Sequence, residues 1–392
     1  MAWIAREIDT LLTERAREKP ALLLTGARQT GKTTLLERAF PKHRYVSLDV
    51  PSVAEQADND SVEFLAQHPA PLIIDEVQYA PKLLRTLKAT VDRAREDAGQ
   101  YLLTGSQKFA LMEGVSESLA GRVAVLELHT LSLRELARAH ARPPSRAEIS
   151  QWMFAGGYPE IHARSLAPER FFSDYVATYL ERDVRQAIEV RNLRTFDRFL
   201  RLCALRTGQL LSTNSLAGDV GISPHTATGW LSVLEASGIV RLLEPYFGNA
   251  GKRLIKTPKL YFMDTGLAAF LAGFRNADEL TASGLHGAFF ETLVCGQIVR
   301  HYANRGQRPS LYFYRDRQGV EVDFVITAGD KAHLIECKTS ANPPTTSRAL
   351  EEVARRFGES QILGRTIIVP EPGRRQVGSV RVEDCVELAD LP

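Results

Sequence analysis

The feature that most constrains this sequence is an apolar run that leads directly into a glycine-rich loop. Residues 21–25 (ALLLT) read as a buried strand, and the loop that follows is Gly26-Ala27-Arg28-Gln29-Thr30-Gly31-Lys32-Thr33. The loop has the spacing G-x-x-x-x-G-K-[ST], and a helical pattern comes after it. Such glycines let backbone N–H groups curl around phosphate oxygens, and the helix N-terminus adds partial positive charge. The sequence therefore predicts a phosphate-binding loop rather than an ordinary turn.

The residue types at the end of the loop indicate a nucleoside triphosphate and a metal ion. A lysine at this position reaches the β- and γ-phosphates, and a hydroxyl beside it offers an oxygen to Mg²⁺. We expect these roles for Lys32, which is also a catalytic residue, and for Thr33. ATP and Mg²⁺ are thus the predicted cofactors. The expected nucleotide-binding residues are Gly26, Ala27, Arg28, Gln29, Thr30, Gly31, Lys32, Thr33, Thr34 and Ser106.

Acidic and polar residues end two further apolar runs. Residues 71–76 (PLIIDE) place Asp75 and Glu76 at the carboxyl end of an expected strand, where open α/β sheets bind ligands. We expect Asp75 to hold Mg²⁺ and Glu76 to polarise the attacking water as the catalytic base. Residues 100–106 (QYLLTGS) form another strand, and Ser106 either senses the γ-phosphate or caps the next helix.

Arg122 comes between an expected helix and the strand at 123–129. At this edge of the sheet a neighbouring subunit has room to dock, so Arg122 is predicted to act on the neighbour's γ-phosphate as an arginine finger. The alternative is a surface arginine that caps a helix C-terminus. The first interpretation requires a homo-oligomer, for which we favour a hexamer.

Composition agrees with a soluble protein of several domains. The chain has 392 residues, 44% hydrophobic and 24% charged, which is enough for roughly two to four domains. Its net charge of +2 gives no bulk argument for nucleic acid, and its four scattered cysteines indicate neither a zinc ribbon nor a disulfide framework. Residues 1–20 read as a helix rather than a signal peptide, and no stretch approaches the ~20 apolar residues of a membrane span. A reduced, cytoplasmic setting is expected.

Together the loop, the acidic pair, the polar strand end and Arg122 resemble the AAA+ ATPases. The stretches 118–122 (SLAGR) and 156–159 (GGYP) are similar to one prokaryotic group, in which a winged helix and a domain of unknown function with a nuclease-like core follow the ATPase. One departure is that the sensor strand ends in Thr-Gly-Ser, where many members have asparagine. The resemblance implies an α/β P-loop sheet at 1–130, a helical lid at 131–206, a winged helix-turn-helix at 207–264 and a PD-(D/E)xK nuclease-like α/β domain at 265–392.

The middle of the chain has a helix-turn-helix pattern of its own. Between the short helix at 214–220 and a second helix, Gly221 allows a tight turn and Ser223-Pro224 forms a helix start. Residues early in the second helix face outward and apolar ones face the core, and strands with several basic residues follow as a wing. Contact with the DNA backbone is favoured, and a structural or protein-binding role is the alternative. The relevant residues are His225, Thr226 and Thr228 outward, Trp230, Leu231 and Leu234 inward, and Arg241, Lys252, Arg253, Lys256 and Lys259 in the wing.

Carboxylates and a lysine are predicted to converge near the end of the chain. Residues 319–340 read as two strands joined by a tight turn, which brings Asp323 near Glu336 and puts Glu336 and Lys338 on one face. Oxygen ligands of this kind suit a divalent ion, with Lys338 as a catalytic residue and Glu291 as an added carboxylate. The pattern resembles the PD-(D/E)xK nucleases, which implies Mg²⁺ on Asp323 and Glu336. The alternatives are a salt-bridged surface and a fold that binds DNA without cutting it.

The function expected from these features is an oligomeric AAA+ ATPase that acts on DNA through a C-terminal metal-dependent nuclease. One alternative is an ATP-driven motor, remodeller of branched DNA or regulatory switch that cuts no strand. A signalling scaffold whose winged helix binds protein is the other.

Overall fold

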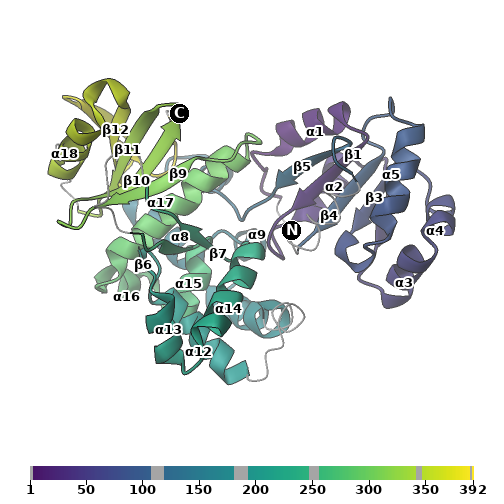
Figure 1. Cartoon of the computed structure of the whole chain (residues 1–392), viewed down its shortest axis with the longest axis horizontal. Helices are drawn as coiled ribbons and strands as arrows, with labels where there is room; N and C mark the ends of the chain where they lie inside the picture. Colours follow the sequence, from purple (N-terminus) through teal and green to yellow (C-terminus); the bar gives the residue numbers. More distant parts are fainter. Residues whose placement is uncertain (1–2, 107–118, 181–192, 247–255, 341–346, 389–390) are drawn as a thin grey trace.

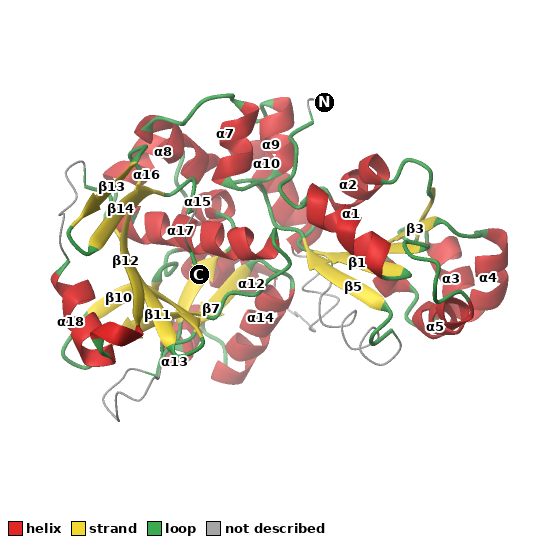
Figure 2. Cartoon of the chain, turned by 90° about the horizontal axis from the view of Figure 1, so that it is seen from above, coloured by secondary structure: helices red, strands yellow, loops and turns green. Residues whose placement is uncertain are grey.

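The computed structural model describes residues 3–106, 119–180, 193–246, 256–340, 347–388 and 391–392. Figure 1 shows two lobes: an N-terminal sheet with its helices on the right, and a larger body that holds the rest of the chain on the left. The view from above in Figure 2 separates the same two lobes, with the segment after β5 joining them. Among the described helices, none is long and apolar enough to cross a membrane.

The N-terminal lobe is built on a five-stranded parallel sheet, in the order β2-β3-β4-β1-β5. Side chains alternate between two buried faces: Leu22 and Leu24 pack against α1 and α2, and Leu23 packs against α3 to α5. A strand buried on both faces reads as a continuous apolar run, which is why the sequence identified it. The predicted parallel α/β sheet is confirmed. The elements are α1 (Asp9–Glu18), β1 (Ala21–Thr25), α2 (Lys32–Ala39), β2 (Arg44–Ser47), α3 (Pro51–Asn59), α4 (Ser61–Gln67), β3 (Leu72–Asp75), the 3-10 helix η1 (Val77–Tyr79), α5 (Leu83–Arg93), β4 (Tyr101–Gly105) and β5 (Val123–Glu127).

Helices follow the sheet, in the stretch 131–206 that was expected to form a helical lid. The first two begin with capping boxes, in which Ser132 pairs with Glu135 and Ser145 with Glu148. Residues 181–192 of that stretch lie outside the described residues. The described helices are α7 (Leu133–Ala139), α8 (Arg146–Ala155), α9 (Pro159–Arg164), α10 (Pro168–Tyr175), the π-helix η2 (Val176–Leu180) and α12 (Leu193–Ala204).

Two helices and a small antiparallel sheet come next. The helices α13 (Thr213–Val220) and α14 (Pro224–Ala236) meet at the left-handed Gly221, and the Ser223 hydroxyl accepts the Thr226 N–H at the start of α14. The sheet has the order β6-β8-β7, from β6 (Gln209–Leu210), β7 (Val240–Leu243) and β8 (Lys259–Phe262). Residues 247–255, which include Lys252 and Arg253 of the predicted wing, fall outside the described residues. The winged-helix assignment itself stays a prediction.

The C-terminal sheet has six strands in the order β13-β14-β12-β11-β10-β9, with parallel and antiparallel pairs. Helix α17 covers one face and α18 the other. The nuclease-like assignment stays a prediction. The elements are α15 (Thr265–Ala272), α16 (Ala277–Ala282), α17 (His286–Ala303), β9 (Leu311–Arg315), β10 (Glu321–Ala328), β11 (Lys331–Cys337), α18 (Arg348–Phe357), the 3-10 helix η4 (Glu359–Gln361), β12 (Ile362–Val369), β13 (Arg374–Val377) and β14 (Val380–Asp384).

One hydrophobic core runs through most of the larger lobe. It joins Trp152 of α8, Phe199 of α12, Trp230 of α14 and Phe290 of α17, and it reaches one face of the last sheet at Phe324. Segments that the sequence analysis assigned to three domains therefore pack as one body against the N-terminal lobe.

Candidate nucleotide-binding and carboxylate sites

The predicted phosphate-binding loop leaves β1 at the carboxyl edge of the first sheet. Gly26 has φ 145°, and a Cβ there would lie 2.1 Å from the Leu128 carbonyl oxygen, so only glycine fits. Positive φ angles at Gln29 and Gly31 turn the loop into the N-terminus of α2. The Lys32 ammonium donates to the carbonyl oxygens of Gly26 (3.1 Å) and Ala27 (2.9 Å). The loop thus has the curled backbone and central cation of a phosphate cradle. Of the predicted binding residues, Thr34 is exposed on the first turn of α2.

Three hydroxyl groups surround the carboxylate of Asp75. The Thr33 hydroxyl donates to Asp75 Oδ1 (2.8 Å), Thr104 at the end of β4 donates to the same oxygen, and Tyr45 of β2 donates to Oδ2 (3.0 Å). Burial and the Asp75 charge raise the pKa of Tyr45 to about 12. A hydroxyl and one carboxylate beside a phosphate site are the oxygen donors that Mg²⁺ uses in such proteins, so Thr33 and Asp75 fit the expected metal.

Glu76 lies at the start of a left-handed turn directly after β3, with φ 55°. Its N–H donates to Thr104 Oγ1 (3.1 Å), while its carboxylate accepts from Ser106 Oγ (3.3 Å) and from the Gln78 amide. The Arg28 guanidinium lies 4.0 Å from the other carboxylate oxygen. Neighbouring strands β3 and β4 thus bring together Asp75, Glu76 and Ser106, and the roles expected of these residues stay predictions.

Arg122 lies at the opposite end of the sheet from the loop. Its carbonyl oxygen accepts the N–H of Ala21, the first residue of β1, and its guanidinium pairs with Asp92 of α5 at 2.5 and 3.0 Å. Within one chain Arg122 is therefore remote from the phosphate loop. Its role toward a neighbouring subunit stays a prediction.

The C-terminal carboxylates have partners of their own. Asp323 Oδ2 accepts the Cys337 N–H (2.7 Å), Lys338 pairs with Glu336, and Glu291 accepts from the Lys259 ammonium (2.8 Å). Burial and the nearby Glu291 charge raise the pKa of Asp323 to about 8. Over the part of the chain that the structure describes, no group of three or more His, Cys, Asp and Glu side chains is arranged to hold a metal ion.

Strand alternation separates two of the predicted metal ligands, Glu291 and Glu336. Ile335 of β11 packs in the core beside α17, whereas Leu334 packs against α18. Glu336 shares the face of Leu334, because successive side chains point to opposite faces. Glu291 lies on α17 and therefore on the other side of the sheet. Glu291 and Glu336 thus lie on different faces, whereas Asp323 stands opposite Glu336 in the pairing of β10 with β11. The expected site on all three carboxylates is therefore not formed within the described residues.

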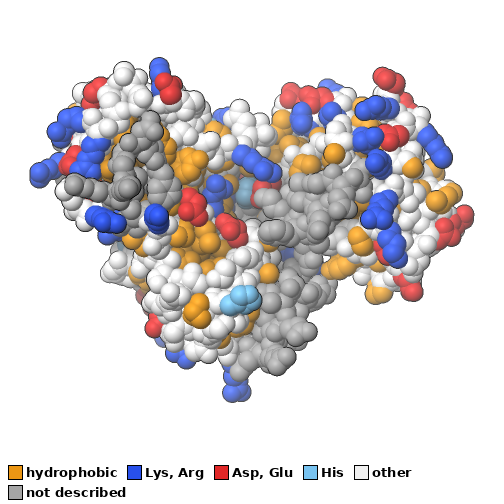
Figure 3. Space-filling model, viewed as in Figure 1, with side chains coloured by type: hydrophobic (Ala, Val, Ile, Leu, Met, Phe, Trp, Pro, Cys, Tyr) orange, Lys and Arg blue, Asp and Glu red, His pale blue; other side chains and the backbone are white. Residues whose placement is uncertain are grey.

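The residues of the helix-turn-helix point outward and inward as predicted. Fewer of the predicted basic residues of the wing lie on the surface, because Lys259 is buried. His225 and Thr228 are exposed and Thr226 is half-buried, while Trp230, Leu231 and Leu234 are buried. Lys259 was predicted to contact phosphate, but it is buried with 2% of its surface exposed. Lys252 and Arg253 lie outside the described residues, Lys256 is exposed and Arg241 is half-buried. On the face in Figure 3, Lys and Arg are scattered over both lobes among Asp and Glu.

Known proteins resemble this chain over most of its length. The uncharacterized protein Rv2008c of Mycobacterium tuberculosis (strain H37Rv) is 32% identical over 347 residues, which is 86% of this chain and 74% of the relative. The uncharacterized protein Mb2031c of Mycobacterium bovis matches to the same extent. The chain belongs to the family of these mycobacterial proteins. Its residues 18–137 match an AAA domain, 146–278 match the domain of unknown function DUF8612, and 286–388 match the domain of unknown function DUF4143.

The solved structures that align with this chain include a Walker-type ATPase and a RuvB protein, both with TM-scores below 0.5. The Walker-type ATPase PABY2304 of Pyrococcus abyssi is 17% identical and aligns over 69% of this chain and 96% of its own, with a TM-score of 0.45. A variant of RuvB from Thermotoga maritima is 19% identical over 61% and 89% of the two chains, with a TM-score of 0.32. The AAA domain match and the parallel sheet identify the N-terminal lobe as an AAA-type P-loop ATPase domain.

The N-terminal lobe contains a buried arginine that the sequence analysis missed. Arg6 precedes α1, and its side chain is 4% exposed. It pairs with Glu135 (3.0 Å) and donates to the carbonyl oxygens of Thr30 in the phosphate loop (2.9 Å) and His129 (2.7 Å). One side chain thus joins the phosphate loop, the end of β5 and helix α7. No local pattern signals this contact, because Arg6 and Glu135 are 129 positions apart.

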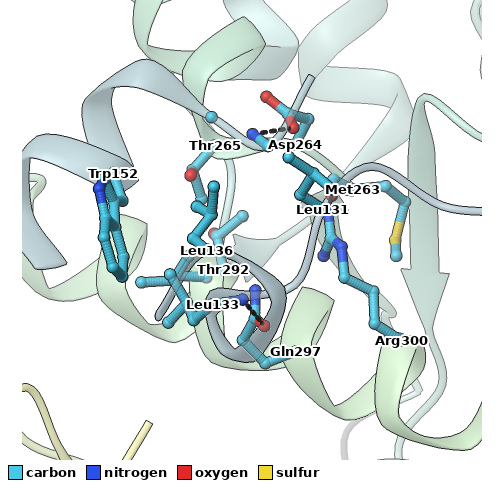
Figure 4. A pocket seen from close by; sticks show the side chains of 13 residues that line it. Leu131, Leu133, Leu136, Trp152, Met263, Asp264, Thr265, Thr292, Gln297 and Arg300 are labelled. Atoms are coloured by element: carbon cyan, nitrogen blue, oxygen red, sulfur yellow. Dashed lines mark hydrogen bonds between the residues drawn. The ribbon is translucent and has the colours of Figure 1, made fainter. Parts of the chain in front are cut away.

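A second buried polar cluster joins the AAA domain to the rest of the chain. Asp264 accepts from the Thr130 hydroxyl (3.0 Å) and the Gly157 N–H (2.8 Å), and Arg300 donates to the Thr130 carbonyl oxygen (2.9 Å). Figure 4 shows Asp264 and Arg300 approaching the Leu131 segment from different elements. The glycines of the GGYP stretch permit this approach, since a Cβ on Gly156 would lie 2.1 Å from Asp264. We call Thr130, Gly157, Asp264 and Arg300 the linker cluster.

Proposed function

We propose that this protein binds MgATP at residues 26–34 and hydrolyses it. The observation that carries the proposal is the convergence of Thr33, Asp75 and Thr104, with Glu76 beside them on the same sheet edge. The match to an AAA domain supports it independently.

Each group in the site has a role that its position supports. The loop N–H groups and the Lys32 ammonium would neutralise the β- and γ-phosphates, which in phosphoryl transfer is most of the catalysis. Thr33 and Asp75 would hold Mg²⁺, which supplies charge neutralisation on the phosphates when bound. Because Arg28 and Gln78 hold the Glu76 carboxylate, it is oriented to accept a proton from a water that attacks the γ-phosphorus. Thr104 and Ser106, at the end of β4, would sense whether the γ-phosphate is present.

Hydrolysis needs a mechanical output, and two contacts are suited to carry it. Arg6 bonds the phosphate-loop carbonyl of Thr30 and the carboxylate of Glu135 on α7. The linker cluster then ties the segment after β5 to α15 and α17. A change in the loop on loss of the γ-phosphate would therefore bias the larger lobe, since packed buried contacts switch rather than stretch. Arg122 would act in trans in a homo-oligomer, with a hexamer favoured.

Nucleotide turnover is the first test. Wild type is expected to release phosphate in a Mg²⁺-dependent reaction, and Lys32→Ala is expected to lose both tight ATP binding and turnover. Thr10→Ala, an exposed hydroxyl on α1, serves as the matched control. Equal rates of phosphate release from wild type and Lys32→Ala would contradict the proposal that this site hydrolyses ATP.

DNA is the second candidate partner, and the exposed face of α14 favours it. His225 and Thr228 lie on this face close to the helix N-terminus, where recognition helices approach a duplex. Thr228→Glu adds a negative charge there, so it is expected to weaken binding of labelled duplex and branched DNA at low salt at least about tenfold. Thr10→Glu adds the same charge far away on α1 and is the control. If both variants bind alike, α14 does not contact DNA, which would favour a protein-binding scaffold.

Cleavage by the C-terminal unit is the alternative output of the cycle. It requires Asp323, Glu336 and Lys338 to act on one metal ion. Lys338 is already paired with Glu336, and among the described residues no group of three or more His, Cys, Asp and Glu side chains is arranged to hold a metal ion. We therefore favour ATP-driven remodelling or switching over cutting. Labelled DNA that stays intact with Mg²⁺ or Mn²⁺ and ATP is the expected result, and cleavage lost in Lys338→Ala would reverse the preference.

A further inference from the structure

Lys259 lies at the junction of the small β6-β8-β7 sheet and the C-terminal sheet. It is the first residue of β8, and its side chain is 3% exposed. Its ammonium lies 2.8 Å from Glu291 of α17 and 2.5 Å from Glu321 of β10, and 5.4 Å from the ring centroid of Phe313. Because so little of this side chain contacts water, the charge of its ammonium is stabilised almost entirely by these two carboxylates.

The ammonium occupies the centre of the acidic cluster on this face of the sheet. Glu291 also accepts the Tyr261 hydroxyl, and Arg315 binds the second oxygen of Glu321 (2.9 Å). Burial alone would lower the pKa of Lys259, but the charges of Glu291, Asp323 and Glu321 outweigh it and raise the pKa. The carboxylates that a metal ion would need thus already have a cation.

We propose that Lys259 is the resident cation of this cluster and that it replaces a divalent metal ion there. Buried carboxylates repel one another unless a positive charge lies between them, and an ammonium and a metal ion cannot share the same oxygens. Because Lys259 comes from β8 and the carboxylates from α17 and β10, the ion pairs also stabilise the packing of the small β6-β8-β7 sheet against the C-terminal sheet and α17. This role is independent of ATP hydrolysis.

The decisive variant is Lys259→Met, which keeps the volume of the side chain and removes its charge. The chain is expected to lose at least about 5 °C in thermal midpoint, because Glu291 loses its buried cation and Glu321 keeps only Arg315. Mn²⁺ is expected to recover most of that loss in Lys259→Met and to leave wild type unchanged. Lys256→Met, which removes an exposed lysine at the entry to the same strand, is the matched control and should alter neither value.

Binding of Mn²⁺ by nucleotide-free protein, measured by electron paramagnetic resonance, locates the ion. Lys259→Met is expected to bind one more Mn²⁺ per chain than wild type, and adding Glu291→Gln is expected to abolish that site. Adding Glu336→Gln should leave it intact, because Glu336 lies on the other face.

Several results would overturn the proposal. If wild type binds Mn²⁺ and Glu291→Gln abolishes that binding, the cluster already holds a metal ion in the presence of Lys259. A folded Lys259→Met that takes up no extra Mn²⁺ shows that the ammonium does not replace an ion, and so does an unfolded Lys259→Met that Mn²⁺ in the refolding buffer does not recover. Extra uptake that depends on Glu336 and not on Glu291 would place the site on the α18 face instead.

Discussion

Replacing Arg6 by methionine tests the contact between the phosphate loop and helix α7. The change removes an ion pair with Glu135 at 3.0 Å and leaves the carbonyl oxygens of Thr30 and His129 without this donor. Breaking a buried ion pair costs about 3–5 kcal/mol. Glu135 keeps two backbone donors, from Glu7 (2.7 Å) and the residue at its helix cap (2.8 Å), so the lower part of that range applies. We expect a loss of about 3 kcal/mol in the free energy of unfolding.

Urea unfolding measures this loss, and a fluorescent ATP analogue measures the second effect. Because the Thr30 peptide is no longer held, ATP affinity is expected to fall about tenfold, or about 1.4 kcal/mol. Arg6→Lys keeps the charge but cannot reach all three acceptors. Its stability and ATP affinity should therefore lie between those of wild type and Arg6→Met. Arg15→Met removes a half-buried surface arginine of α1 and should cost under about 1 kcal/mol without changing affinity. An Arg6→Met chain with wild-type stability and affinity would refute the reasoning.

Three further changes have expected outcomes. Asp264→Ala leaves four buried donors without an acceptor and should cost more than about 3 kcal/mol in urea unfolding; a loss under about 1 kcal/mol would contradict the linker cluster. Burial lowers the pKa of His333 to about 4 from 6.5, so the unfolded chain takes up the proton first as pH falls. The contribution of neutral His333 to the free energy of unfolding is fully present above about pH 6.5 and is lost toward pH 4, by about 2 kcal/mol between pH 7 and 5. His333→Gln should remove this pH-dependent loss, and a variant with the wild-type pH profile would contradict the assignment. Arg122→Ala should leave the urea unfolding midpoint nearly unchanged while reducing ATPase activity only in oligomers; full activity in mixed oligomers would exclude an arginine finger.

The nucleotide site could be predicted because its signals are local in the sequence. Gly26 and Lys32 belong to one loop, and Asp75 and Glu76 end one strand. Their meeting needs only the rule that parallel strands bring their carboxyl ends to one edge. The order of strands, with β4 between β3 and β1, puts Thr104 beside Asp75 and completes the site.

The contacts that join the lobes could not be predicted in the same way. Arg6 and Glu135 look like ordinary helix-surface charges, and nothing near Asp264 in the sequence indicates that Thr130 is its partner. Lys259 is the clearest example. As a lysine in a strand it reads as an exposed phosphate contact, but the packing of β8 against α17 buries it. Strand alternation was read correctly at β11, but the side of the sheet that α17 covers was not visible in the sequence.

The most direct test of the central claim is a comparison of ATP binding and phosphate release in wild type and Glu76→Gln. Gln keeps the size of the side chain and its hydrogen bonds to the turn, but it cannot accept a proton. The account predicts that Glu76→Gln binds ATP as tightly as wild type and releases phosphate at least about 100-fold more slowly. Equal rates of phosphate release from the two proteins would contradict the assignment of this site as the centre of ATP hydrolysis.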